Sequence, residues 1–191
     1  MKIITQVIFM FALVFVSIHT AEAVQPIDQF TVMDQASWNC AKTIAVTMFP
    51  VVGEFKGEKN LDYYQNDFAS KLASSLRKIP GVEKVDVVDG KTTVLADILI
   101  DGKFKDLTTG SRALRFWVGF GAGKSFCRAD MKGIDLKSGS EVFSLDHARG
   151  SAMDIVSEDE LLENIDEVVE DVAAGLIAAR RVCASGSSPA K

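Results

Sequence analysis

The sequence T-G-S-R-A-L-R-F-W-V-G-F-G-A-G-K-S occupies residues 109–125 and separates two strand-like runs in the middle of the chain. It contains four glycines, two arginines, one lysine and three large aromatic residues, and it has no acidic residue. Glycine allows a backbone to approach a neighbouring group closely, and tryptophan and arginine are enriched at the energetic centres of interfaces. The composition therefore predicts a binding segment carried between two strands of a sheet.

Strand-like sequence lies on both sides of this segment. Residues 97–107 begin as a buried apolar run and continue with alternating apolar and polar residues, while 126–136 and 141–148 also read as strands. The K-S-G-S sequence at 137–140 predicts a hairpin turn between the last two of these strands. Gly102 interrupts the first strand, which indicates either a bulge or a close approach of another group to the backbone.

The rest of the chain supplies helices and two further strands. These are a buried strand at 43–49, an amphipathic helix at 62–78, a half-buried strand at 82–88, and a long helix from a Ser157–Glu160 capping box to about Val182. The order β-α-β-β-β-β-α predicts one α/β domain of the α+β type, with a mixed sheet of about five strands and two main helices. We expect this domain to span residues 42–183, with a lead-in arm at 24–41 before it and a disordered tail at 184–191 after it.

Residues 1–23 have the pattern of a secretory signal peptide. Lys2 supplies the positive charge, residues 3–18 are almost wholly apolar, and A-E-A at 21–23 has the spacing of small residues that a signal peptidase accepts. A membrane anchor is the alternative, but the apolar run is shorter than the roughly 20 residues that span a bilayer. We therefore expect an exported, periplasmic protein whose mature chain starts at Val24 and has 191 − 23 = 168 residues.

An exported chain meets an oxidising compartment, so its three cysteines are informative. Cys40 precedes the first strand of the predicted domain, Cys183 ends the last helix, and Cys127 lies inside a strand among small residues. The odd number leaves at least one thiol unpaired. We expect a Cys40–Cys183 disulfide and a buried free thiol at Cys127. We expect no lipid attachment, because the residues before Cys40 are S-W-N rather than a lipobox.

Charge and motif spacing argue against nucleic-acid and nucleotide partners. The net charge of −5 does not suit general nucleic-acid binding, which needs a basic face. The G-F-G-A-G-K-S run at 119–125 resembles a phosphate-binding loop, but that motif needs four residues between its first glycine and Gly-Lys-Ser. Here three residues separate Gly119 from Gly123, and strand-like rather than helical sequence follows.

Candidate catalytic and metal-binding groups are few. The mature chain has one histidine, His147. Its neighbour Asp146 would point to the opposite face of a strand, so the two cannot form the orienting pair of a Ser-His-Asp triad. The aspartates that lie along strands and turns lack the spacing of a calcium loop; they are Asp97, Asp101, Asp130 and Asp135. We expect no enzyme, no cofactor and no metal, and an enzyme that uses His147 is the alternative left open.

Cations and aromatic rings alternate between Gly110 and Ser125. In one interpretation the rings are ordinary core and the glycines are bulges in a bent strand. In the other, which we favour, the segment is a surface element that binds an envelope protein, a glycan or a lipid headgroup. Arg112 and Arg115 would then face an anion and Trp117 would be the apolar anchor. The complete predicted site is Gly110, Ser111, Arg112, Arg115, Trp117, Gly119, Gly121, Gly123 and Lys124.

The opening stretch, with A-D-I-L-I-D-G-K-F before it and L-K-S-G-S-E-V-F after it, resembles an uncharacterised family of exported bacterial proteins, domain-of-unknown-function family forty-four-ten. Members carry a G-S-R-x-x-R-x-x-x-G-x-G-A-G signature between two strands, and the resemblance runs from about Lys42 to Ala179. The family has no assigned activity, so the resemblance implies an exported protein but no reaction.

A looser similarity reaches the curli secretion channel subunit and the outer-membrane activators of peptidoglycan synthases. The shared features are the order of elements, an A-D-x-x-x-x-G strand, and a glycine-rich aromatic segment ahead of a hairpin. In the channel, neighbouring segments extend into membrane-crossing hairpins, whereas Arg128, Asp130 and Lys132 here occupy a run that would have to be apolar toward lipid. We expect a non-enzymatic envelope accessory protein. An oligomeric, outer-membrane-associated or channel-like subunit is the alternative.

Overall fold

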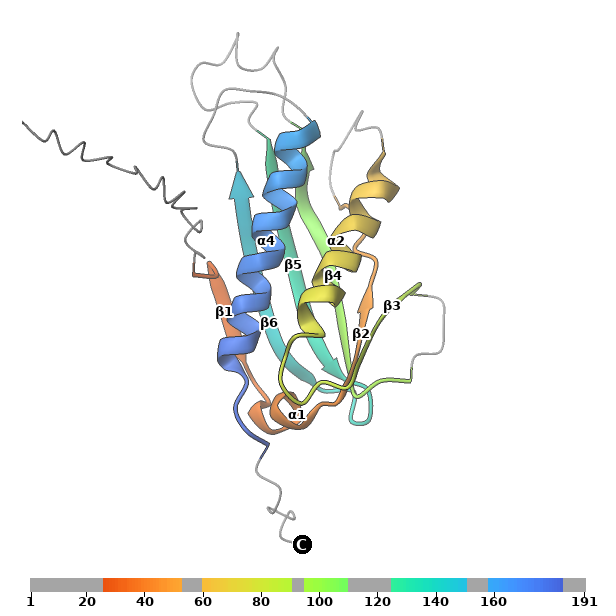
Figure 1. Ribbon diagram of the computed structural model, residues 1–191, viewed down its shortest axis with the longest axis vertical. Coiled ribbons are helices and arrows are strands. Elements are labelled where there is room, and N and C mark those ends of the chain that lie inside the picture. The colour runs from red at the N-terminus through yellow and green to blue at the C-terminus, as the bar shows by residue number, and fades with distance from the viewer. Residues whose placement is uncertain (1–25, 53–59, 91–94, 110–124, 151–157, 184–191) are drawn as a thin grey trace, which may run out of the picture.

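The computed structural model describes residues 26–52, 60–90, 95–109, 125–150 and 158–183 of the 191-residue chain. The elements are β1 (Gln29–Val32), α1 (Gln35–Cys40), β2 (Thr43–Thr47), α2 (Leu61–Leu76), β3 (Lys84–Val88), β4 (Ile98–Thr108), β5 (Phe126–Asp135), β6 (Glu141–Gly150) and α4 (Glu158–Ala179). Helices α2 and α4 lie side by side across one face of a single sheet (Figure 1). The protein therefore has two layers, with the core between helices and sheet.

The sheet has the strand order β1-β6-β5-β4-β2-β3, in which β2 is parallel to β3 and β4 and the other neighbours are antiparallel. The mixed α+β fold is confirmed, and from β2 onward so is the order β-α-β-β-β-β-α. The described sheet has six strands rather than about five, because β1 pairs with β6 at the edge. Four residues in a polar arm are too few for a periodic pattern to identify.

Helix α1 is the other element that the sequence reading missed. The Asp34 carboxylate caps it by accepting hydrogen bonds from the Ser37 amide at 3.0 Å and the Ser37 hydroxyl at 2.7 Å. These bonds stabilise the ionised carboxylate and lower the pKa of Asp34. The capped helix inserts Trp38, whose ring packs edge-on to Phe143 at 5.1 Å and whose indole donates to the Leu176 carbonyl at 3.2 Å. Thus α1 closes the core below α4.

Aromatic rings fill the core between α2 and the sheet. Phe68 of α2 lies 5.2 Å from Phe49 and 5.0 Å from Phe104 of β4, measured between ring centroids. The Phe49 ring packs directly on Gly102, where a Cβ would lie 2.6 Å from Phe49 Cε2. Of the two interpretations of this glycine, close approach is correct. The bulge in β4 lies further along the strand, between Phe104 and Asp106.

Both long helices follow the apolar stripes predicted for them. In α2 the buried residues Tyr64, Phe68, Leu72 and Leu76 recur every four positions. In α4 the buried stripe is Leu161, Ile165, Val168, Val169, Val172 and Leu176. Within the described ranges, no helix combines the length and the apolar character needed to cross a membrane.

The predicted cysteine arrangement is confirmed. A Cys40–Cys183 disulfide joins the end of α1 to the residues after α4, across a sequence separation of 143 residues. Beside it, the Gln35 side chain donates to the Ala179 carbonyl at 2.8 Å. Cys127 is free and buried in β5, and loss of solvent raises the pKa of its thiol. Cys127 is therefore a packing residue rather than a reactive one.

Candidate functional site

Of the predicted binding segment, Gly110 to Ser125, residues 110–124 lie outside the described residues. All nine residues of the predicted site are among these, so their roles stay predictions. The structure does describe the residues from which the segment leaves and to which it returns. These are Thr109, after the end of β4, and Ser125, before the start of β5.

Both ends of this segment lie next to three paired residues, one on each of three neighbouring strands. Thr108 of β4 pairs with Phe126 of β5, and Phe126 pairs in turn with Gly150 of β6. The chain leaves this row for the 110–124 segment and also for the connection from β6 to α4. We call the Thr108–Phe126–Gly150 row the loop end of the sheet.

A third connection attaches close to the same place. It begins after Val52, whose amide donates to the Phe104 carbonyl at 3.0 Å, and it ends at Asn60, just before α2. In Figure 1 the start of α2 and the start of α4 both lie at the loop end. The topology therefore brings the attachment points of three connections to one end of the molecule, although they are far apart in sequence.

A buried hydrogen bond fixes the point where the segment rejoins the sheet. The Ser125 hydroxyl accepts from the Asn164 side chain of α4 at 2.9 Å, and both residues are buried. A buried amide requires such a partner, so the bond ties the first turns of α4 to β5. The sequence analysis did not identify Asn164. Its only signal is a polar residue within the apolar stripe of α4, between Leu161 and Ile165.

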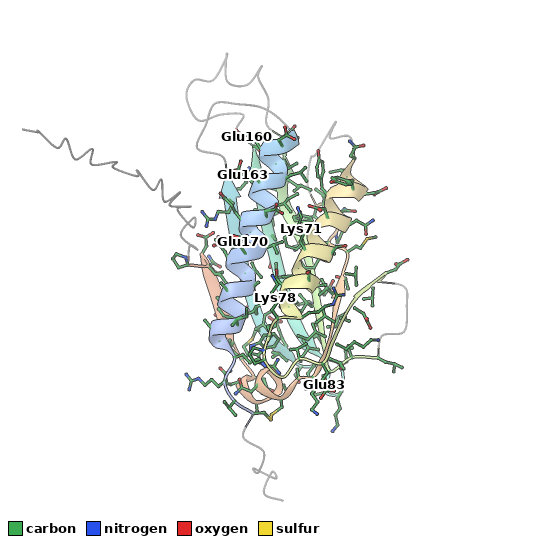
Figure 2. The ribbon with its side chains drawn as sticks, viewed as in Figure 1. Lys71, Lys78, Glu83, Glu160, Glu163 and Glu170 are labelled. Atoms are coloured by element: carbon green, nitrogen blue, oxygen red, sulfur yellow. A yellow bond between two sulfur atoms is a disulfide. The ribbon has the colours of Figure 1, made fainter. Side chains whose placement is uncertain are left out.

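The surface of α4 beside the loop end is strongly acidic. Helix α4 contains eight acidic residues and no Lys or Arg, and of the eight Asp171 is buried. Glu160, Glu163 and Glu170 are drawn along this helix in Figure 2. An ion pair between the two helices joins Lys71 of α2 to Asp166 of α4. A segment with three cations and no acid thus leaves the sheet beside an acidic helix.

The sheet face opposite α2 and α4 carries a paired ionic network. Arg128 binds the Asp146 carboxylate through two nitrogens, at 2.8 and 3.2 Å, and Lys105 binds it at 2.5 Å. Lys105 also lies 3.0 Å from Asp130. Burial alone would raise the pKa of Asp146, but the hydrogen bonds from Arg128 and Lys105 outweigh burial and lower it. These groups neutralise each other, which is typical of a structural network.

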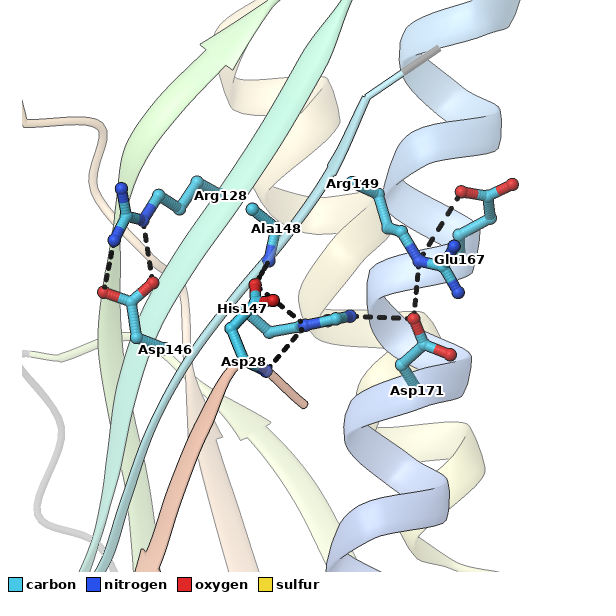
Figure 3. Close-up of polar contacts among 8 residues, drawn as sticks. All are labelled: Asp28, Arg128, Asp146, His147, Ala148, Arg149, Glu167 and Asp171. Carbon is cyan, nitrogen blue, oxygen red and sulfur yellow. Dashed lines mark hydrogen bonds and ion pairs between the residues drawn. The ribbon is translucent and has the colours of Figure 1, made fainter. Parts of the chain in front are cut away.

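His147 points the other way, into the layer between β6 and α4 (Figure 3). Its Nε2 lies 2.7 Å from Asp171 of α4, and its Nδ1 lies 3.3 Å from Asp28 at the start of β1. Arg149 donates to the same Asp171 oxygen at 2.6 Å. The expectation that Asp146 and His147 face opposite sides of the strand is therefore confirmed. His147 therefore links β6 to α4 and to the residue that precedes β1.

The described residues offer no group of three or more His, Cys, Asp or Glu side chains positioned to hold a metal ion. Asp97 is engaged instead with the Lys42 and Thr43 amides, both at 2.8 Å. Asp135 accepts from the amides of Lys137 and Ser138 in the β5–β6 turn, at 2.8 and 3.0 Å. Asp97 and Asp135 thus stabilise backbone amides, while Asp101 accepts from the Thr47 hydroxyl at 3.0 Å.

A family model described as Domain of unknown function (DUF4410) matches residues 16–154. No curated protein matches the chain. Among solved structures, the chain is similar to a PelC dodecamer from Paraburkholderia phytofirmans, with 14% identity and a TM-score of 0.54, over 80% of this chain and 99% of that one. A variant of that dodecamer gives 16% identity and a TM-score of 0.51, over 80% and 98% of the two chains.

A minor lipoprotein from Acinetobacter baumannii is also matched, at 9% identity and a TM-score of 0.36, over 72% of this chain and 93% of that one. At these identities the structural matches establish a shared fold, and the last is too distant to support an argument. The family match covers most of the chain and confirms the resemblance that the glycine-rich signature indicated.

Proposed function

We propose that this chain, which belongs to the family described as Domain of unknown function (DUF4410), is an exported, non-enzymatic accessory protein of the bacterial cell envelope. It acts in the periplasm by binding another envelope component through residues 110–125. Arg112 and Arg115 contact an anionic group of the partner, and Trp117 contacts an apolar one. The partner is an envelope protein, a glycan or a lipid headgroup.

The Thr108–Phe126–Gly150 row carries this proposal. It holds both ends of the segment in a hydrogen-bonded ladder, and the Ser125–Asn164 bond ties its exit to α4. A segment whose ends are already ordered loses less conformational freedom when a partner binds. The ordered residues at its two ends therefore favour binding of a partner by this segment.

The binding role is tested by capture from an envelope extract. The mature protein is immobilised and compared with an Arg112→Ala/Arg115→Ala/Trp117→Ala variant. A Lys132→Ala/Lys137→Ala variant is the control, because it removes the same number of positive charges from exposed positions elsewhere on the sheet. We expect the first variant to lose the captured component and the control to retain it. Equal capture by all three proteins contradicts the proposal.

Export is tested separately, by mass spectrometry of the protein recovered from cell fractions. The expected form begins at Val24, lies in the periplasmic fraction and carries the Cys40–Cys183 disulfide. A chain that retains residues 1–23 and stays in the cytoplasm contradicts the assigned location.

A ring-forming subunit is the second candidate, and the shared fold with a PelC dodecamer favours it. Among the described strands, β1 and β3 form the two edges of the sheet, so neighbouring copies can approach along them. Native mass measurement in plain buffer and in detergent separates the two candidates. A single symmetric oligomer in both solvents supports a ring, and a monomer at micromolar concentration opposes it.

A further inference from the structure

A cavity of about 510 Å³ lies next to the disulfide, at the end of the molecule opposite the loop end. Cys40 and Cys183 form part of its wall, and Pro80 and Ile177 add apolar surface. Its volume falls within the range of roughly 300–1,000 Å³ that is usual for small-molecule sites. We call it the disulfide-end cavity. None of the residues discussed for the binding segment contributes to it.

Arg180 is the unusual group in this cavity. Its Nη2 donates to the Ala41 carbonyl at 2.5 Å, and its guanidinium lies 5.5 Å from the centre of the Trp38 ring. Its Nη1 is buried, and the described part of the chain provides it with no hydrogen-bond partner. Partial burial lowers the pKa of Arg180, and no carboxylate among the residues that the structure describes offsets that effect. A half-buried guanidinium with an unpartnered nitrogen and no neighbouring carboxylate among the described residues is suited to bind an anion.

The rim of the cavity adds charge and apolar surface. Arg181 and Lys42 also line it as exposed cations, and Lys42 pairs with Glu83 at 2.9 Å. Val182 is 93% exposed and Ile177 is 39% exposed, which is unusual for aliphatic residues placed together beside an opening. A ligand that satisfies all of these groups has an anionic end and an apolar body.

We propose that the disulfide-end cavity binds an anionic amphiphile, that is, a carboxylate or phosphate group attached to an apolar chain. The anionic group lies against the Arg180 guanidinium in the cavity, and Arg181 adds attraction at the rim. The apolar chain leaves along Ile177 and Val182. A fatty acid and an anionic phospholipid share this chemistry, so the probes below include one of each.

Binding is measured by calorimetry on the mature chain with its disulfide intact, below the critical micelle concentration of each probe. The probes are laurate, a twelve-carbon lysophosphatidylglycerol, the corresponding lysophosphatidylcholine, and inorganic phosphate. We expect the two anionic amphiphiles, or one of them, to bind at a single site. The zwitterionic lipid and free phosphate should bind at least about tenfold more weakly, because each lacks one of the two recognised features. Preference for laurate identifies a fatty-acid site, and preference for the lysolipid identifies a headgroup site.

Two pairs of proteins test the location. Val182→Asp places a carboxylate at the rim, and Val182→Asn is its matched neutral control; both keep the fold because the position is exposed. We expect the aspartate variant to bind at least about fivefold more weakly than the asparagine variant. Arg180→Gln removes the guanidinium and should lose measurable binding, and its thermal unfolding is compared with that of the wild type to verify folding.

Three results overturn the proposal. The first is equal affinity for the anionic and zwitterionic lipids, and the second is equal affinity of the Val182→Asp and Val182→Asn variants. The third is binding that appears only in a chain ending at Cys183, which would assign the cavity to the protein's own residues 184–191. Capture of an envelope partner through residues 110–125 is a separate measurement, so either proposal can fail alone.

Discussion

Replacing Cys40 and Cys183 together by alanine removes the disulfide without leaving a new thiol. Both cysteines are exposed, so the substitution costs little packing. The bond closes a loop with a sequence separation of 143 residues, from the end of α1 to the residues after α4. Its removal therefore acts chiefly by increasing the conformational freedom of the unfolded chain.

The magnitude follows from the length of that loop. For a separation of 143 residues, the chain-entropy relation gives roughly 5 kcal/mol at 25 °C. Residual structure in the unfolded state reduces measured values, so we expect a loss of about 3–5 kcal/mol in the free energy of unfolding. In the folded state, the Gln35–Ala179 bond and the bond from the Arg181 amide to Asn39, both 2.8 Å, still hold the two ends together. The folded structure should therefore survive.

Urea unfolding of the mature wild type, the double variant and the reduced wild type measures the effect. The double variant and the reduced wild type should unfold at the same urea concentration, well below the oxidised wild type. Thiol labelling provides the control: in denaturant the oxidised protein should label once, at Cys127, and the reduced protein three times. A loss below about 1 kcal/mol would refute the entropic argument.

Three further substitutions test the packing and the ionic contacts, each by urea unfolding. Gly133→Ala should cost about 1–3 kcal/mol, because its Cβ would lie 2.4 Å from Phe143 Cε1; an unchanged midpoint would show that the ring can move. Asp171→Ala should cost about 3–5 kcal/mol, because it removes the buried carboxylate that contacts both His147 and Arg149; a loss equal to that of an exposed aspartate would contradict this. Asp146→Asn should cost about 1–2 kcal/mol at pH 7. The lowered pKa of Asp146 means that its carboxylate stabilises the fold above the unfolded pKa of about 3.9, and that this contribution is lost as the pH falls through the lower folded pKa. The difference in the free energy of unfolding between the wild type and Asp146→Asn should therefore disappear below about pH 4. A difference that does not change with pH would refute the stabilising role of the Asp146 carboxylate.

Local patterns were sufficient for the parts of the fold that repeat over many residues. The stripe of Tyr64, Phe68, Leu72 and Leu76 predicted α2 because four turns of periodic burial leave a clear signal. The turn at 137–140 was predictable because glycine there adopts a positive φ, which is 74° at Gly139. The strand β1 and the helix α1 were missed because each is short. Their stability comes from contacts with β6 and α4, which are distant in sequence.

The candidate binding segment likewise has some features that the sequence predicts and others that depend on contacts between distant residues. Its composition, with two arginines, three aromatic rings and four glycines, was enough to propose a site and to identify the family. The contact of Ser125 with Asn164 was not predictable, because 39 residues separate them and only the packing of α4 on β5 brings them together. The same holds for the unpartnered Arg180 Nη1, since its isolation depends on what surrounds it.

The amino-acid sequence by itself determined the strand and helix periods, the pairing of Cys40 with Cys183, and the placing of Asp146 and His147 on opposite faces of a strand. These properties depend on local geometry and on compartment chemistry. Only the tertiary structure decided which strands are neighbours, that the three connections share the loop end, and that the half-buried Arg180 lines a cavity beside the disulfide. Those features arise from long-range pairing and desolvation, which depend on groups far apart in the chain and leave no periodic mark in it.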